Sequence, residues 1–269
     1  MHLKTLIMIL HFITWNVNPE IFDLGFIAPR WYGLLFASSF FFGYLIMQRF
    51  FQKEGIENKV LDKLTTYMLV STVIGARLGH VFFYDWSYYK NHLIEILYVW
   101  QGGLASHGAA IAILMGLYFF ARSEKRDYLW VVDRIVIVTA LAGFFIRMGN
   151  LMNSEIYGHQ TDLPWGFIFE RVGETIPKHP TQIYEALSYL FIFLYLLWYY
   201  YKKDAKTPNG YLLGMFLILV FGMRFLIEFI KENQVAFESN MTLNMGQWLS
   251  IPAVLGGLFL VWYSRRFKT

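Results

Sequence analysis

Six of the ionisable residues inside the long apolar segments of this 269-residue chain are candidates for function, because a charge there is costly and usually marks function. They are Arg77, His107, Arg147, Glu185, Arg224 and Glu228. A guanidinium group can hold a phosphate through paired hydrogen bonds, and a histidine can accept a proton near neutral pH. Two or three arginines beside one histidine therefore suit an anionic phospholipid headgroup better than an ion path.

The segment that begins at Arg147 collects further polar groups. Arg147, Asn150, Asn153 and Glu155 bring one guanidinium, two amides and one carboxylate together within nine residues, and Gly158 follows them. A snorkelling arginine at a helix end is the simpler interpretation, but it gives the amides and glycines no role. We therefore expect an anion-binding site in this segment.

The other charged positions leave more than one interpretation open. Arg224 and Glu228 are four residues apart and share one helix face. They are either an internal ion pair that packs the bundle, or a site in which Glu228 orients Arg224 for a ligand. His107 lies among small residues and is either a packed histidine or a general base. Arg77 either pairs with Glu185 or belongs to the same site.

The composition excludes several classes of protein. Hydrophobic residues make up 57% of the chain and charged residues 16%, whereas soluble domains have about 45–50% and about 25%. This indicates an integral membrane protein. The chain has no cysteine, which excludes thiolate metal sites and cysteine nucleophiles, and it has no HExxH, GxSxG or P-loop motif. We expect no metal, no cofactor and, at a net charge of +4, no nucleic-acid partner.

Seven segments are long and apolar enough to cross a hydrocarbon core of about 30 Å. They are Trp31–Phe50, Thr65–Tyr84, Leu104–Ala121, Trp130–Gly149, Ile183–Tyr201, Tyr211–Ile230 and Trp248–Ser264. Thirteen of the 23 lysines and arginines fall on one side of these segments and six on the other. By the positive-inside rule, the N-terminus is outside and the C-terminus is cytoplasmic.

The sequence thus predicts an all-α polytopic membrane protein, with about seven transmembrane helices and short extracytoplasmic elements in a single transmembrane domain over residues 1–269. We expect residues 1–30 to form an interfacial segment on the outer face and residues 150–182 to form an extracytoplasmic loop. Gln182 and Glu185 are expected to face inward. Asp133 and Arg134, near the cytoplasmic end of a span, are expected to be a solvated or snorkelling pair.

The motifs resemble those of the prolipoprotein diacylglyceryl transferase family along nearly all of the chain. The matching segments are Arg30–Gly33, Gly75–Gly79, Gly102–Gly108, Arg147–Gly158, His179–Glu185, Arg224–Phe229 and Met245–Pro252. The family's signature usually reads Gly-Arg-x-Gly-Asn-Phe. Here Ile146 and Leu151 replace its first glycine and its phenylalanine, and Ala109 replaces the second glycine after the histidine. These differences affect packing rather than polar groups.

The resemblance implies a reaction in the bacterial inner membrane, at a site toward the extracytoplasmic side. Members of the family transfer the diacylglyceryl group of phosphatidylglycerol to the lipobox cysteine thiol of a prolipoprotein signal peptide. A thioether forms and glycerol phosphate leaves, which is the first step of bacterial lipoprotein maturation. The implied partners are phosphatidylglycerol, the surrounding membrane lipid and prolipoprotein signal peptides.

The resemblance also implies site residues. It gives Arg147 as the arginine that binds phosphatidylglycerol, Arg224 as a second essential arginine and His107 as the proposed base. The other substrate-binding residues that it implies are Tyr32, Asn150, Glu155, Gly158 and Glu228. We add Arg77 to this set.

Two other functions would use the same buried charges. A membrane transporter would pass an anionic solute along the arginines, and a structural subunit would pair them with a partner. Transfer of lipid to a lipobox peptide separates the enzyme from both.

Overall fold

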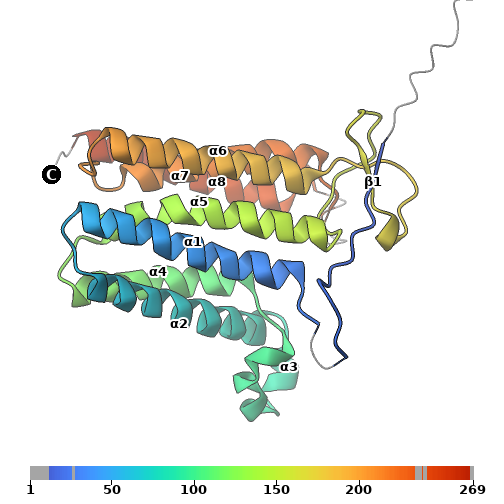
Figure 1. Ribbon diagram of the computed structural model, residues 1–269, viewed down its shortest axis with the longest axis horizontal. Helices are drawn as coiled ribbons and strands as arrows, with labels where there is room; N and C mark the ends of the chain where they lie inside the picture. The colour runs from blue at the N-terminus through green and yellow to red at the C-terminus, as the bar shows by residue number, and fades with distance from the viewer. Residues whose placement is uncertain (1–11, 26–27, 234–237, 239–240, 267–269) are drawn as a thin grey trace, which may run out of the picture. The chain divides into compact units, whose positions relative to one another are not determined.

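The structure, a computed structural model, describes residues 12–25, 28–233, 238 and 241–266. Within these residues the chain is mainly α-helical, with one pair of very short strands (Figure 1). The helices are α1 (Trp31–Lys53), α2 (Asn58–Phe83), α3 (Trp86–Tyr89), α4 (Ser106–Ser123), α5 (Tyr128–Met152), α6 (Thr181–Lys202), α7 (Tyr211–Ile227) and α8 (Met245–Arg266). The all-α prediction is confirmed.

Six helices of the described residues are long and apolar enough to cross a membrane: α1, α2, α5, α6, α8, and α7 together with the 3₁₀-helix η4 (Glu228–Ile230) that continues it. Each coincides with one of the predicted spans. The remaining predicted span coincides with α4, which is not among the six. The structure therefore supports a polytopic membrane protein with six candidate spans.

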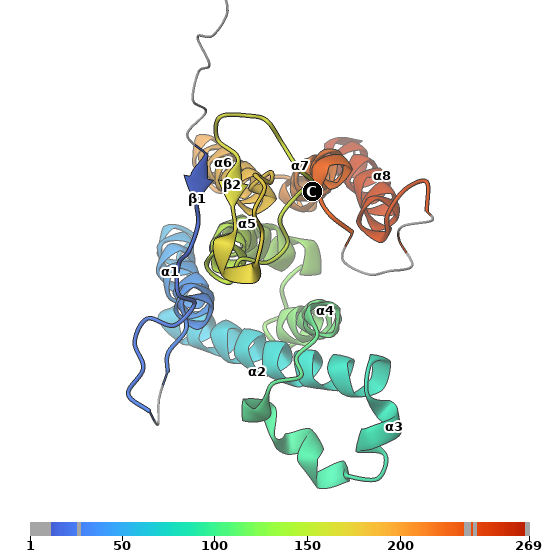
Figure 2. The same ribbon diagram turned by 90° about the vertical axis from the view of Figure 1, so that its right-hand side faces the viewer.

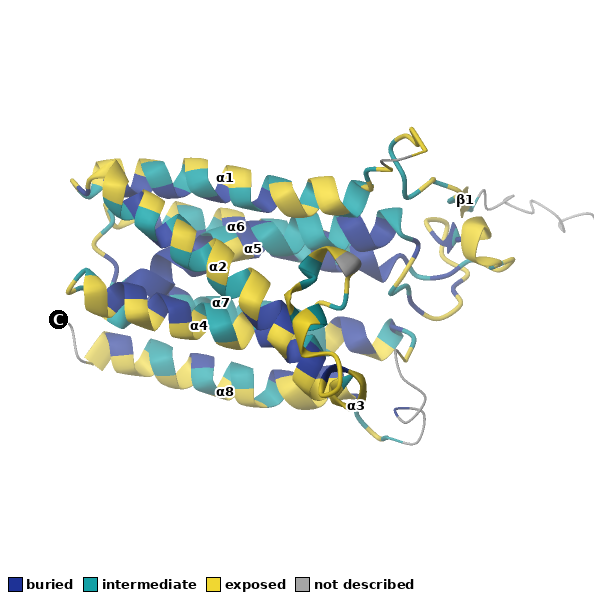
Figure 3. Cartoon of the chain, turned by 90° about the horizontal axis from the view of Figure 1, so that it is seen from below, coloured by how far each residue is buried: buried dark blue, intermediate teal, exposed yellow. Residues whose placement is uncertain are grey.

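Along these helices, large apolar side chains that a soluble protein would bury are exposed. Phe41 on α1, Phe191 on α6 and Leu258 on α8 are each more than half exposed, and exposed and buried residues alternate around the helices (Figure 3). An apolar outer surface fits a lipid environment, where helices satisfy their own backbone hydrogen bonds.

The chain folds as two compact units. One contains residues 44–135, and the other contains the described residues before 44 and from 136 to 266. Helices α1 and α5 each run from one unit into the other. We refer to them as the small unit (44–135) and the large unit.

In the large unit, α6, α7 and α8 pack side by side (Figure 1 and Figure 2). Gly214 of α7 and Gly257 of α8 face each other, and a Cβ atom built on Gly214 would lie 2.8 Å from the carbonyl oxygen of Gly257. Small residues let membrane helices approach this closely.

The segment between α5 and α6, residues 153–180, contains the strand β2 (Phe167–Ile168) and the 3₁₀-helix η3 (Glu170–Val172). β2 pairs in parallel with β1 (Ile13–Thr14). Next to this pair, Leu151, Phe167 and Phe169 form a buried cluster against which Trp15 packs. These contacts position part of the predicted interfacial segment, whose residues 1–11 and 26–27 lie outside the described residues, so the interfacial placement stays a prediction.

In the small unit, α2 packs against α4 through glycines. A Cβ atom built on Gly79 would lie 2.7 Å from the Cα of Gly108, and one built on Gly75 would clash with the Cβ of Ala112. Gly75 and Gly79 form the G-x-x-x-G spacing that brings helix backbones together in membranes. Beyond α2, an arm contains α3 and the 3₁₀-helices η1 (Leu93–Leu97) and η2 (Val99–Gln101) (Figure 2).

A Gly75→Val substitution is expected to lower the free energy of unfolding by about 1–3 kcal/mol, because the new side chain must push α2 away from α4. Thermal unfolding of the detergent-solubilised protein measures this. The neighbouring Ile74→Val substitution is the control, because Ile74 is 52% exposed and its replacement should change stability little. Equal melting temperatures for the two variants would contradict the packing argument.

The expectation for Asp133 and Arg134 is wrong. Both residues are buried, with relative exposures of 0% and 2%. The Nε and Nη2 atoms of Arg134 donate hydrogen bonds of 3.1 and 3.0 Å to the carboxylate of Glu54, the residue that follows α1, and the guanidinium lies 4.4 Å from the ring centroid of Trp130. Arg134 is thus paired inside the protein instead of reaching water.

Candidate functional site

The C-terminal end of α5 carries a short chain of polar contacts. The Nη1 atom of Arg147 donates a hydrogen bond of 3.2 Å to Asn150, and the Nδ2 atom of Asn150 donates one of 2.8 Å to the carboxylate of Glu155. Arg147 and Asn150 are three residues apart and therefore share one face of the helix. Three of the predicted site residues thus lie in direct contact.

The backbone just after α5 turns sharply to place Glu155. Ser154 and Ile156 both have positive φ angles, of 54° and 62°, a strained conformation for a β-branched residue such as Ile156. Two residues of α6 hold the turn: the Oγ1 atom of Thr181 donates to the carbonyl of Ile156 at 2.8 Å, and Nε2 of Gln182 donates to that of Glu155 at 2.6 Å. The motif that opens α6 therefore fixes the Glu155 segment.

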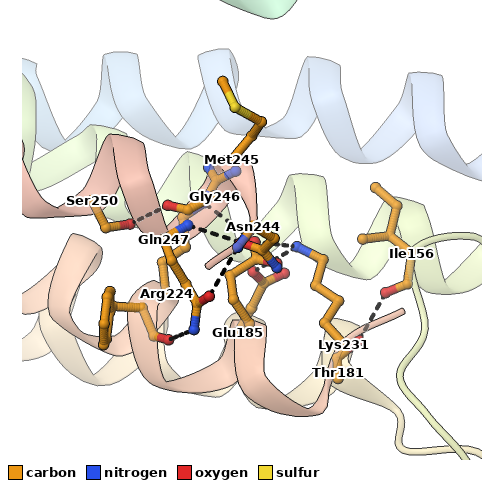
Figure 4. A network of polar contacts seen from close by, with 12 residues as sticks. Ile156, Thr181, Glu185, Arg224, Lys231, Asn244, Met245, Gly246, Gln247 and Ser250 are labelled. Atoms are coloured by element: carbon orange, nitrogen blue, oxygen red, sulfur yellow. Dashed lines mark hydrogen bonds and ion pairs between the residues drawn. The ribbon is translucent and has the colours of Figure 1, made fainter. Parts of the chain in front are cut away.

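An ion-pair network continues from Arg147 toward α7. Its Nε atom lies 2.7 Å from Glu185 Oε2, and the other oxygen of Glu185 lies 3.5 Å from the Nζ atom of Lys231. Lys231 Nζ also lies 2.9 Å from Glu228 Oε1, which is 3.5 Å from Nε of Arg224. The two predicted arginines therefore belong to one network of charges, and Figure 4 shows the Lys231 side chain reaching toward Glu185.

The members of this network differ in exposure. Glu185, Lys231 and Glu228 have side-chain exposures of 0%, 3% and 5%. Arg147 is 13% exposed and Arg224 33%. The carboxylates and the lysine are thus internal, while the arginines at both ends are the accessible groups. Such an arrangement offers guanidiniums, oriented by buried carboxylates, to an anion.

Residues at the N-terminal end of α8 support Glu228. Asn244 donates a hydrogen bond of 3.0 Å from Nδ2 to Glu228 Oε2, and the Asn244 and Gln247 side chains each accept from the other residue's backbone N–H. Gly246 lies directly against the Glu228 carboxylate, whose Cδ would be 2.6 Å from a Cβ atom built there. A side chain at position 246 would therefore displace the carboxylate.

A Gly246→Ala substitution is expected to reduce activity by about tenfold. Shifting Glu228 loosens its ion pair with Arg224 and weakens the hydrogen bond that Lys231 donates to it, and a hydrogen bond to a charged group is worth about 1.5–3 kcal/mol. Initial rates of the reaction that the resemblance implies measure this. The matched control is Gly256→Ala in the same helix, where a Cβ atom would meet no atom within 4 Å. Equal losses in both variants would contradict the role assigned to Gly246.

Two other predicted residues lie beside this network. The Tyr32 ring packs on Gly149 of α5, since a Cβ atom there would lie 2.7 Å from the ring. Gly158 forms an isolated β-bridge with Lys231, and a Cβ atom on Gly158 would clash with the carbonyl oxygen of Ile230 and lie 2.8 Å from the Cβ of His179. The structure thus explains why position 158 needs a glycine.

The two remaining predicted residues, His107 and Arg77, belong to the small unit. His107 is exposed near the start of α4, and its ring contacts Phe83 and Tyr84 with centroid distances of 5.7 and 5.5 Å. An exposed histidine at a helix end is accessible to a substrate, as a general base requires.

Arg77 is 3% exposed and holds the arm in place. Its guanidinium donates hydrogen bonds to the backbone carbonyls of Glu95 at 2.5 Å, Ile96 at 2.9 Å and Gly102 at 2.8 Å. It also lies 4.9 Å from the ring centroid of Tyr89. These contacts give Arg77 a structural role in the small unit, and its predicted role in substrate binding stays a prediction.

Comparison with known proteins assigns the family. The family model described as prolipoprotein diacylglyceryl transferase matches residues 19–263. A phosphatidylglycerol–prolipoprotein diacylglyceryl transferase of Tolumonas auensis is 48% identical over 255 residues, covering 94% of this chain and 98% of the relative. The chain belongs to this family. The transferase of Chloroherpeton thalassium is 47% identical over 254 residues, and that of Bacteroides fragilis is 42% identical over 269 residues, each covering more than nine-tenths of both chains.

The part of the chain that matches the prolipoprotein diacylglyceryl transferase family includes all the predicted site residues. It also includes two members of the network that are not among the predicted site residues, Glu185 and Lys231. Glu185 is one of the six charges singled out within the spans and was expected to face inward, whereas Lys231 is one of the six cations counted on the outer side of the spans. The signal for Lys231 was its spacing of three residues from Glu228, which lets both side chains lie on one side of a helical turn.

A second lysine in the large unit also bridges two carboxylates. Lys178 Nζ lies 2.5 Å from Glu232 and 3.5 Å from Glu174. Burial alone would lower the pKa of Lys178, but the two carboxylates raise it above its usual value. Burial and a hydrogen bond to Glu174 raise the pKa of the neighbouring Tyr157 to about 12. In this family member, Lys178 therefore stays charged and Tyr157 neutral at physiological pH.

Proposed function

We propose that this chain transfers the diacylglyceryl group of phosphatidylglycerol to the lipobox cysteine thiol of a prolipoprotein signal peptide, the first step of bacterial lipoprotein maturation. Membership of the transferase family supports the reaction. The observation that carries the proposal is the network that joins Arg147 and Arg224 through buried carboxylates.

The reaction forms one bond and breaks one. The cysteine thiol loses its proton to a base, and the sulfur attacks the glycerol carbon that carries the phosphate. The carbon–oxygen bond breaks, a thioether forms, and glycerol phosphate leaves with the electron pair. The phosphate goes from a diester with one negative charge to a monoester with up to two, since its second pKa is about 6. Groups that bind this growing charge stabilise the transition state more than the substrate.

The arginines supply that stabilisation in the proposed mechanism. Arg147 and Arg224 hold the phosphate oxygens, and the carboxylates of Glu185 and Glu228 orient them. Because the guanidiniums are already in place before the reaction, they need little reorganisation as the charge develops. Two guanidiniums provide the charge that a metal ion would otherwise supply.

The remaining predicted residues have supporting roles in the proposal. His107 takes the thiol proton, since a cysteine pKa of about 8.5 leaves little thiolate at neutral pH. Asn150 and Tyr32 position Arg147 and the headgroup, and Glu155 holds Asn150 by accepting a hydrogen bond from it. Arg77 contributes by holding the arm of the small unit.

We further propose that α4 is a seventh span, with the N-terminus outside, the C-terminus in the cytoplasm and the site toward the extracytoplasmic side of the inner membrane. Two observations support this. Helix α4 packs against the candidate span α2 along glycine contacts, and lysines and arginines are concentrated on the side that would then be cytoplasmic.

Mass spectrometry of a lipobox peptide tests the function. The purified protein is incubated with the peptide in phosphatidylglycerol micelles. The expected product is the peptide with its cysteine sulfur joined to diacylglycerol, and a peptide with alanine in place of the cysteine should stay unmodified. A folded protein that leaves the cysteine peptide unmodified while passing anions through liposomes would instead indicate a transporter.

A further inference from the structure

Lys231 occupies the centre of the ion-pair network. It is 3% exposed and contacts two carboxylates, Glu228 at 2.9 Å and Glu185 at 3.5 Å. Each of these carboxylates contacts one of the two arginines, Arg147 or Arg224. Lys231 is therefore the only group of this five-membered network that joins its two halves, and its removal would separate the arginines into two independent ion pairs.

The network carries one net positive charge. It contains three cations, namely Arg147, Arg224 and Lys231, and two carboxylates. Without Lys231, each arginine would be neutralised by its own carboxylate. The next carboxylate, Glu155, is reached through Asn150 and is exposed, so water screens it far more than the buried groups.

The backbone holds Lys231 in position independently of its side chain. The N–H of His159 donates to the carbonyl of Ile230 at 2.9 Å, and the N–H of Glu232 donates to the carbonyl of Tyr157 at 3.2 Å. Lys231 itself forms a β-bridge with Gly158. The turn after α5 thus sets where the lysine side chain enters the network.

We propose that Lys231 is a positioning residue for the phosphate group: it ties Glu185 to Glu228, so that Arg147 and Arg224 keep a fixed spacing, and it leaves the network with one net positive charge opposite a singly charged phosphodiester. This inference rests on the function proposed above. It assigns Lys231 to recognition of the lipid and not of the peptide, which gives it a specific kinetic consequence.

Steady-state kinetics with each substrate varied in turn tests the proposal. A Lys231→Met variant is expected to raise the KM for phosphatidylglycerol by roughly 10- to 100-fold and to leave the KM for the lipobox peptide within about threefold of wild type, since breaking a buried charge pair weakens binding by at least this much. A Lys231→Arg variant, which keeps the charge and can reach both carboxylates, is expected to restore most of the lipid affinity.

Lys178→Met is the matched control, because Lys178 also bridges two carboxylates but lies outside the network. It is expected to leave the lipid KM near wild type. If Lys231→Met does not fold, Lys231→Gln replaces it, because an amide can donate to both carboxylates without carrying a charge. Equal changes in both KM values, an unchanged lipid KM, or the same lipid KM in the Lys231→Arg and uncharged variants would overturn the inference. Failure of the wild-type protein to modify the peptide would instead overturn the proposed function.

Discussion

An Arg147→Ala variant is expected to transfer lipid roughly 10²–10³ times more slowly than wild type, the usual cost of removing one group that stabilises charge in a transition state. Arg147 contacts both Glu185 and Asn150, so its removal takes away a phosphate-binding group and leaves a buried carboxylate without its partner. The rate is measured by mass spectrometry of a lipobox peptide in phosphatidylglycerol micelles.

Two further variants separate charge from geometry. Arg147→Lys keeps the charge, but one ammonium group cannot take the places of both Nε and Nη1, so we expect it to remain at least tenfold slower than wild type. Arg30→Ala is the control for loss of an arginine, since the Arg30 side chain is 63% exposed and pairs only loosely with Glu20, at 3.5 Å. Near-normal transfer by Arg147→Ala would remove this residue from the mechanism.

A Gly158→Val variant is expected to lose nearly all activity and to unfold at a markedly lower temperature. The new side chain would overlap the carbonyl of Ile230 and press on His179 and Thr181, which breaks the β-bridge to Lys231. Overpacking of this kind costs about 1–3 kcal/mol, and the displaced Lys231 adds the loss of its buried ion pairs.

Thermal unfolding and lipid KM, measured on the same preparation, check this prediction. Gly256→Val is the control, because the space around Gly256 is open to a Cβ atom. The argument for Gly158 fails if the Gly158→Val protein has the same melting temperature as wild type, since the clash would then be absent. It also fails if the variant melts lower but binds phosphatidylglycerol with unchanged affinity, because the clash would then not reach Lys231.

Apolar length predicted most of the fold, because each candidate span is a continuous run that only a helix can carry through lipid. The prediction for Asp133 and Arg134 failed for a physical reason. Local sequence places a charge near a helix end, but it does not show that Glu54, about 80 residues earlier, comes within 3.0 Å of Arg134. Long-range ion pairs of this kind depend on helix packing.

In the candidate site, too, residues close together along the chain could be predicted and long-range contacts could not. Arg147, Asn150 and Glu155 could be grouped from the sequence because they are close along the chain, and the structure brings them together. Lys231 was missed because it looked like an ordinary loop lysine, and its buried position follows from the backbone pairing with Gly158. The roles of His107 and Arg77 stay predictions, since both belong to the other unit.

The parallel pairing of β1 with β2 has a consequence for biosynthesis. Ile13 pairs with Phe167, so β1 cannot pair until the ribosome has synthesised about 150 further residues. At roughly 5–20 residues per second, this delay is about 8–30 s. During this time the candidate spans α1, α2 and α5 are made while the N-terminal strand lacks its partner, and a chaperone that shields unpaired strands would have its longest opportunity there.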